Sequence, residues 1–210
     1  MRQNVSLAEI SDGHLYKAND MVKADCGGCE GCSQCCRGMG ISIILDPYDV
    51  YRLTTGIGKS MQELLATSVE LNVVDGVILP NLKMQGTREA CAYLDTEGRC
   101  SIHPYRPGIC RLFPLGRHYE NGGLFYFLQT GECAKENRSK VKVSKWIDTP
   151  ELKRNEQFKL QWHDLLSAMT DRVAGEDEGK QREENLLLLR LFYLLPYEGT
   201  TDFYSQFMER

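Results

Sequence analysis

Nine cysteines give this 210-residue chain its most chemically informative pattern. Five of them fall between Cys26 and Cys36, in the run C-GG-C-EG-C-SQ-CC. Two thiolates separated by two residues can bind one metal ion, because the intervening turn directs both sulfurs to the same side. The glycines between them suit such turns, since glycine accepts a positive φ. The spacing therefore predicts a metal centre held by Cys thiolates.

Three other interpretations of the cysteines are structural disulfides, inert burial and a single redox-active pair. Each explains the cysteine pattern less well than metal binding does. Structural disulfides are disfavoured by the odd cysteine count and by the absence of a secretory signal pattern at the N-terminus. Inert buried cysteines behave as small hydrophobes, but five cysteines among Gly, Glu, Ser and Gln do not resemble a core stripe. A single redox-active C-x-x-C pair leaves the remaining cysteines unexplained, and no βαβ pattern surrounds one.

Iron–sulfur clusters and zinc are the two candidate cofactors. The spacing Cys26-x₂-Cys29-x₂-Cys32-x₃-Cys36 reproduces a bacterial ferredoxin run, although Arg37 stands where a proline usually follows. Zinc also binds four thiolates at C-x₂-C spacing. We favour an iron–sulfur cluster and keep zinc as the alternative.

The neighbouring pair Cys35-Cys36 adds geometric information. Side chains of adjacent residues usually point apart, so these two sulfurs are expected to serve two neighbouring sites or separate corners of a polynuclear centre. Two sites need about eight ligands. The later cysteines supply the remainder, so we expect the first run to lie beside them in space; they are Cys91, Cys100, Cys110 and Cys133.

The later cysteines have recognisable local settings. Cys91 and Cys100 flank a predicted turn at residues 96–98, and Pro107 is expected to open a short helix that carries Cys110. The N-terminal amides of that helix would favour a thiolate.

Charged and imidazole side chains stand among these cysteines. Guanidinium groups would offset thiolate charge, although solvated surface positions are the alternative; the arginines are Arg99, Arg106 and Arg111. His103 is a candidate nitrogen ligand, but a structural hydrogen-bonding role is favoured because sulfur ligands are plentiful. The carboxylates are scattered, so no catalytic residue and no reaction are assigned.

Local signals predict the supporting elements. Asp46 and Pro47 open a helix that we expect to end at Gly56, and a Ser60 capping box opens a second helix over residues 61–72. Asp-Gly at 75–76 and Asn-Gly at 121–122 predict two β-hairpins. Thr149 and Pro150 are expected to begin a helix that runs to Gly175, followed by another helix before Pro196 and a short terminal helix.

The expected fold class is α+β, a small metal-stapled core of short hairpins and helices with a helical C-terminal layer. We divide the chain into an N-terminal arm (1–25), a cysteine-cluster core (26–140) and a helical region packed on it (141–210).

Bulk properties limit the partners. The net charge of −4 and the pI near 5.6 argue against a general nucleic-acid binder. The longest apolar stretch, 186–195, is interrupted by Arg190 and is shorter than the roughly 20 residues that span a bilayer, so no membrane partner is expected. We expect a cytoplasmic protein with reduced thiols. The sequence identifies no substrate or protein partner.

Three motifs in order resemble the YkgJ-type cysteine-cluster family: the CxxCxxCC run, the segment RPGICRLFP at 106–114, and GEC at 131–133. That family is described as a zinc- or iron-chelating domain, and the same domain occurs within flagellin lysine methylases, where an iron–sulfur cluster is implied. The resemblance covers about residues 26–135 and leaves Cys26 outside the family pattern, as a further candidate ligand. It implies eight metal-binding residues: Cys29, Cys32, Cys35, Cys36, Cys91, Cys100, Cys110 and Cys133.

Overall fold

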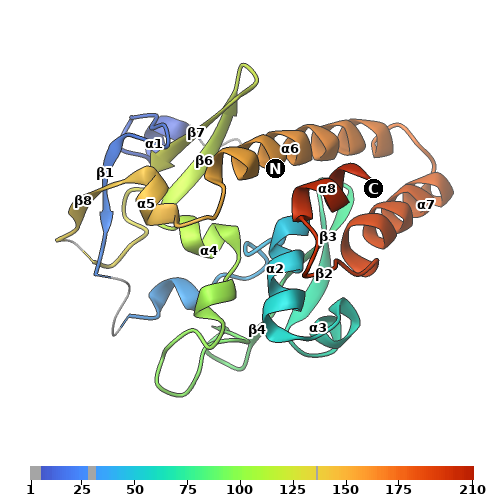
Figure 1. The fold of residues 1–210 in the computed structure, drawn as a ribbon, viewed down its shortest axis with the longest axis horizontal. Helices are drawn as coiled ribbons and strands as arrows, with labels where there is room; N and C mark the ends of the chain where they lie inside the picture. Colours follow the sequence, from blue (N-terminus) through green and yellow to red (C-terminus); the bar gives the residue numbers. More distant parts are fainter. Residues whose placement is uncertain (1–5, 28–31, 136) are drawn as a thin grey trace.

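The computed structural model describes residues 6–27, 32–135 and 137–210, and these form a mixed α+β fold, as expected (Figure 1). Within them the helices are α1 (Leu7–Ile10), α2 (Pro47–Ile57), α3 (Met61–Thr67), α4 (Gly108–Leu112), α5 (Val143–Ile147), α6 (Leu152–Val173), α7 (Glu178–Leu189) and α8 (Phe203–Met208). Three short helical segments accompany them, η1 (Gln34–Cys36), η2 (His103–Tyr105) and the π-helical η3 (Arg190–Leu194).

The described strands pair antiparallel in four two-stranded sheets, β1–β8, β2–β3, β4–β5 and β6–β7. Their bounds are β1 (Met21–Asp25), β2 (Val69–Val74), β3 (Val77–Leu82), β4 (Met84–Gln85), β5 (Ala90–Cys91), β6 (Leu115–Glu120), β7 (Gly123–Leu128) and β8 (Ser139–Lys142).

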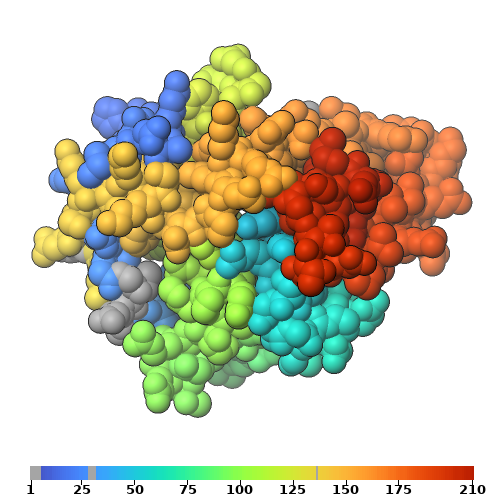
Figure 2. All heavy atoms as spheres, viewed as in Figure 1, coloured from blue at the N-terminus to red at the C-terminus, as the bar shows by residue number. Residues whose placement is uncertain are grey.

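Two hydrophobic cores organise the molecule. The main core joins α2, α3 and the β2–β3 hairpin to α6, α7, η3 and α8, and the small core joins β1, β6, β7 and α5. In Figure 1 the small core lies on the left and the main core on the right, with α6 passing across the top. Figure 2 shows the C-terminal residues between the α6–α7 layer and the α2–α3 segment on this face. The cysteine-bearing segments connect the two cores.

Both predicted hairpins are present. Asp75 and Gly76 turn β2 into β3 with φ values of 49° and 81°, and Asn121 and Gly122 turn β6 into β7 with values of 51° and 69°. A two-residue hairpin turn with positive φ at both positions matches the right-handed twist of the strands, and Asp-Gly and Asn-Gly adopt it at low cost.

Helix α2 begins at Pro47 as predicted, but it does not end at Gly56. It continues through Gly56 to Ile57 and ends at Gly58, whose φ is 71°. A Cβ at Gly56 would lie 2.2 Å from Cδ1 of Tyr105, so this glycine provides space for a ring rather than a helix end.

Helix α3 is shorter than the sequence suggested. It opens with the predicted Ser60–Glu63 capping box but ends at Thr67. Residues 69–72, expected to continue it, instead belong to β2, because pairing with β3 buries Val69. Tertiary pairing overrides helix propensity here.

The C-terminal third is helical, as predicted, with one boundary in error. Helix α6 begins at Leu152 rather than after Thr149, because Asp148 and Glu151 take left-handed conformations and turn the chain first. The short terminal helix is present as α8, where Phe203 and Phe207 pack edge-on against Phe158 of α6. Among the described residues, no helix is both long and apolar enough to cross a membrane.

Buried charges link the main core to the segment that carries Cys110. Asp49 of α2 is 3% exposed, and its Oδ1 accepts the Gly108 backbone N–H at 2.7 Å. Lys159 of α6, equally buried, forms an ion pair with Asp46, the cap of α2. Burial raises the pKa of Asp49 to about 6. These contacts fix the start of α4 relative to α2 and α6.

Removing the Asp49 acceptor should destabilise the protein. Asp49→Ala leaves the buried Gly108 N–H without its partner, which costs about 1–3 kcal/mol of unfolding free energy. Asp49→Asn keeps an acceptor oxygen and should lose less. Urea denaturation of both variants measures the difference, and equal stability of the two variants would contradict this role for the Asp49–Gly108 bond.

The raised pKa of Asp49 also predicts a pH dependence. An unfolded aspartate titrates near pH 3.9, below the folded value of about 6, so ionisation of Asp49 disfavours the folded state. The stability of the natural protein relative to Asp49→Asn should be highest below about pH 4 and should fall as pH rises through about 6. Denaturation of both proteins from pH 4 to 8 tests this; a difference that does not change with pH would oppose it.

Candidate metal centre

Eight of the nine cysteines lie in the described part of the chain, and all eight are partly buried. Cys29, a predicted ligand, lies outside the described residues. The eight form two neighbouring groups. We call them the inner group (Cys36, Cys91, Cys100 and Cys110) and the outer group (Cys26, Cys32, Cys35 and Cys133).

Short local elements place the inner group against the main core. Cys91 ends β5 and pairs with Met84 of β4, while Cys100 forms a bridge to Leu94 across a turn. Asp95 shapes that turn, because its Oδ1 accepts the backbone N–H of Glu97 at 3.0 Å and that of Arg99 at 2.8 Å. The predicted turn is therefore present. Three of the inner cysteines pack against main-core residues, namely Cys91, Cys100 and Cys110.

Backbone pairing places Cys36 beside this set. Arg37 forms an antiparallel bridge with Ala90, and the Gly38 N–H donates to the Glu89 carbonyl at 2.9 Å. Cys36 directly precedes Arg37 and Cys91 directly follows Ala90, so the two cysteines flank this bridge. The first cysteine run and the later cysteines thus lie side by side.

The surroundings of the inner-group thiols disfavour their ionisation to thiolates. Burial raises the pKa of Cys110, and the proximity of Cys91, Asp49 and Cys100 raises it further. Burial also raises the pKa of Cys91 and of Cys100. Several thiolates can occupy this space together when a cation offsets their charge, which is what a bound metal provides.

Helix α4 carries Cys110 and begins after Pro107, as predicted, but its first amide is bonded to Asp49. Its amides were expected to favour the thiolate, but the Gly108 N–H is donated to Asp49. The carboxylate of Asp49 also raises the pKa of the Cys110 thiol. Asp49 stands 61 positions before Cys110 in the chain, so local sequence gave no sign of this contact.

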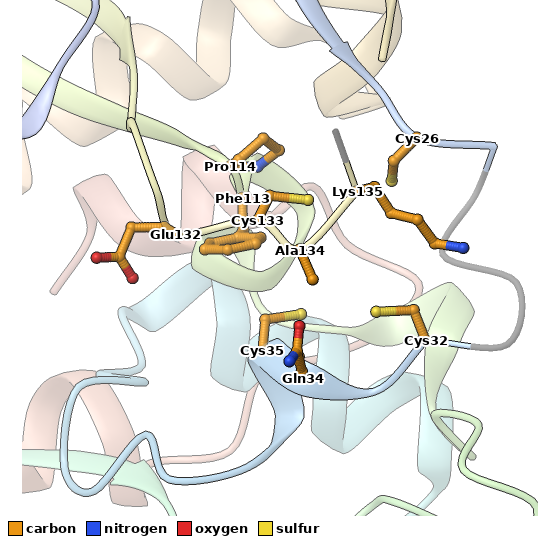
Figure 3. Close-up of a pocket in the computed structure, with 10 residues that line it drawn as sticks. All are labelled: Cys26, Cys32, Gln34, Cys35, Phe113, Pro114, Glu132, Cys133, Ala134 and Lys135. Carbon is orange, nitrogen blue, oxygen red and sulfur yellow. The ribbon is translucent and has the colours of Figure 1, made fainter. Parts of the chain in front are cut away.

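Four sulfurs of the outer group surround a small cavity of about 20 Å³ (Figure 3). In the close-up, the sulfurs of Cys26, Cys32, Cys35 and Cys133 point toward a common space. Lys135 also lines the cavity, a residue that the sequence pattern did not single out.

Cys35 lies between the two groups. A hydrogen bond links its thiol with that of Cys36, and this bond is the largest cause of the raised Cys35 pKa, ahead of burial. Its charge also acts on Cys100 and Cys110 of the inner group. Since Cys35 also lines the outer cavity, the two groups are contiguous.

The three arginines play different parts. Arg106 lies near Cys35 and Cys100 and lowers the pKa of both thiols against the effect of burial. Its Nε is buried and has no hydrogen-bond partner among the described residues, while NH1 lies 2.6 Å from His103 Nε2. Arg111 instead donates to backbone carbonyls, including that of Ile147 at 3.3 Å. The charge of Arg99 helps to lower the pKa of His103.

The sulfurs are neighbours without being close enough for direct coordination. Across residues 6–27, 32–135 and 137–210, no three His, Cys, Asp or Glu side chains are grouped tightly enough to hold an ion as they stand. The donors form two contiguous sets, and binding has to draw their sulfurs together.

A comparison with protein families finds a match over residues 28–142, to the family CxxCxxCC, "Putative zinc- or iron-chelating domain". The match includes the described cysteines from Cys32 to Cys133 and begins after Cys26. Searches of curated proteins and of solved structures found no match.

The two groups predict separable losses of metal. Cys110→Ser should release metal held by the inner group and spare the outer group, and Cys133→Ser should do the reverse. Cys35→Ser should affect both, because Cys35 contacts both groups. Metal content per chain after gel filtration measures the three variants. Identical metal content in all three variants and in the natural protein would contradict a role for these thiols as ligands.

Proposed function

Because this chain belongs to the CxxCxxCC family of zinc- or iron-chelating domains, we propose that it is a metal-binding protein that holds an iron–sulfur centre through its cysteine thiolates. The proposed ligands are the eight cysteines implied by the family motifs. They include the four cysteines of the inner group and also Cys29. The proposed setting is the cytoplasm, where thiols stay reduced.

The observation that carries this proposal is the gathering of sulfur donors from four separate segments. Cys91, Cys100 and Cys110 come from β5, a turn and α4, pack against the main core and lie close enough for their charges to interact. Cys36 of η1 directly precedes Arg37, which bridges to Ala90, the neighbour of Cys91. Four thiolates are the usual ligand set of an iron–sulfur cluster. The nearby imidazole of His103 is engaged by Arg106, which favours sulfur alone as the ligand.

Arg106 supports the fit to an anionic centre. Its buried Nε has no hydrogen-bond partner among the described residues, and a buried N–H without an acceptor is costly. A metal-bound thiolate or an inorganic sulfide beside Cys35 and Cys100 would accept this hydrogen bond. Hydrogen bonds to cluster sulfurs also tune reduction potential.

When bound, such a centre supplies one-electron transfer. We propose that the chain serves as a redox protein or as the redox component of a protein-modifying system. Its own residues bind the centre, limit its access to water and place Arg106 beside its sulfurs.

Structural zinc is the second candidate, and the outer cavity favours it. A volume near 20 Å³ admits one water-sized occupant, which suits a single ion better than a cluster. In that case the metal shapes a surface for a protein partner and no reaction occurs.

Purification without oxygen distinguishes the two. We expect iron and acid-labile sulfide in the natural protein, with broad visible absorbance that bleaches on reduction by dithionite. Cys110→Ser should lose most of that absorbance, whereas Glu132→Gln, a control at the outer cavity, should keep it. Zinc without iron or sulfide would contradict the iron–sulfur proposal and favour the structural-zinc alternative.

A further inference from the structure

We propose that Cys26 is a metal ligand, and that with Cys32, Cys35 and Cys133 it forms a second centre for one thiophilic divalent ion, Zn²⁺ or Fe²⁺. The inference deepens the proposed function and rests on it, because it extends thiolate binding of metal to a residue outside the family match. The family motifs do not include Cys26, so the structure alone carries this assignment.

Strand pairing brings Cys26 to the outer cavity. Strand β1 ends at Asp25, directly before Cys26, and lies antiparallel to β8, in which Ser139 pairs with Asp25. The antiparallel arrangement places the end of β1 beside the start of β8. The chain that leaves β1 through Cys26 and the chain that enters β8 from Cys133 therefore share one end of this sheet.

The position of β1 is set by burial. Val22 is 1% exposed and Ala24 is fully buried, and both belong to the small core with Val143 of α5. Register slippage by one residue would turn these side chains to solvent, so the buried face fixes the register. The pairing shifts by one residue between Val22 and Asp25, so the end of β1 before Cys26 is placed by the pairing of Asp25 with Ser139.

Hydrogen bonds also fix the backbone that directly follows β1. Asp25 Oδ1 accepts the Gly27 N–H at 3.0 Å, and Ser139 Oγ donates to Asp25 Oδ2 at 3.2 Å. Gly27 has a φ of 72°, a conformation that glycine adopts without strain. This turn lies on both sides of Cys26 and restricts where its side chain can point.

The cavity suits one ion. Its four sulfurs point toward a common space in Figure 3, and its volume of about 20 Å³ exceeds the 10–15 Å³ or so that one water requires. A tetrahedral zinc–thiolate site has Zn–S distances near 2.3 Å, so binding has to draw the sulfurs inward. Three of the four cysteines lie outside regular secondary structure, namely Cys26, Cys32 and Cys133.

One cationic and one anionic side chain line the cavity, Lys135 and Glu132. Four thiolates and one divalent ion carry a formal charge of about −2. Lys135 lines the cavity and extends past Cys26 and Cys32 in the close-up, whereas the carboxylate of Glu132 points away from the sulfurs. Both side chains line the cavity, and in this view neither charged group points into the space between the sulfurs.

The assignment also accounts for the adjacent pair. Among the described residues, Cys35 completes a set of four in the outer group, and Cys36 completes a set of four in the inner group. Neighbouring side chains that diverge from one backbone segment can serve two centres in this way. One metal ion in the outer set and an iron–sulfur centre in the inner set are then compatible.

Thiol protection tests the proposal in the natural chain. The protein is loaded with Zn²⁺, or stripped by a chelator, then alkylated with iodoacetamide, and modification at each cysteine is read by peptide mass spectrometry. We expect Cys26 to be protected by metal to the same degree as Cys32 and Cys133. Alkylation of Cys26 at the same rate with and without metal, while Cys32 is protected, would overturn the inference.

Cys26→Ser gives an independent measurement, with Glu132→Gln as its control. Titration with Co²⁺ should show weaker sulfur-to-metal charge-transfer absorbance and more than about tenfold weaker binding at the outer set, since even a second-shell partner of a metal ligand is worth 10–100-fold. The iron and sulfide content of the inner set should be unchanged. Unaltered Co²⁺ binding in Cys26→Ser would refute the role of Cys26.

The two proposals fail in different ways. Protein that lacks iron and sulfide but shows Cys26-dependent binding of Zn²⁺ contradicts the iron–sulfur assignment and supports this inference. Protein with iron, sulfide and a metal complement that does not depend on Cys26 supports the proposed function and contradicts this inference.

Discussion

The electrostatics of crowded thiols is the constraint on which the rest of this structure depends. Burial raises the pKa of Cys91, Cys100 and Cys110, and their mutual proximity opposes ionisation further. The segments that carry them form two-residue strands, turns and one short helix, which supply few hydrogen bonds of their own. A bound cation resolves both problems, because it compensates the thiolate charges and ties the short segments together.

The protein meets this constraint by placing the cysteines between two hydrophobic cores. The inner group rests on the main core, while Cys26 follows a strand of the small core. The Asp49–Gly108 hydrogen bond holds the start of α4 to α2, so the position of Cys110 depends on the packing of the main core. Metal bound across Cys35 would therefore join the two cores as well as the cysteine segments.

Features encoded by neighbouring residues could be predicted from the sequence, and features that depend on distant contacts could not. Asp75-Gly76 and Asn121-Gly122 specify hairpins locally, and both formed. The role of Gly56 depends on the ring of Tyr105, about 50 positions away, so the prediction of a helix end there was wrong. The proximity of Cys26 to Cys133 likewise required the pairing of β1 with β8, which no local pattern indicates.

The adjacent pair Cys35-Cys36 couples the two proposed centres. The two thiols share a hydrogen bond, which raises the pKa of Cys35. Metal binding at either set requires a thiolate and so removes a proton from this pair. With four thiolates around one divalent ion, the first centre to fill would carry a formal charge of about −2, which would disfavour ionisation of the remaining thiol. Occupation of one proposed centre would therefore weaken metal binding at the other, and by thermodynamic linkage the effect would be reciprocal.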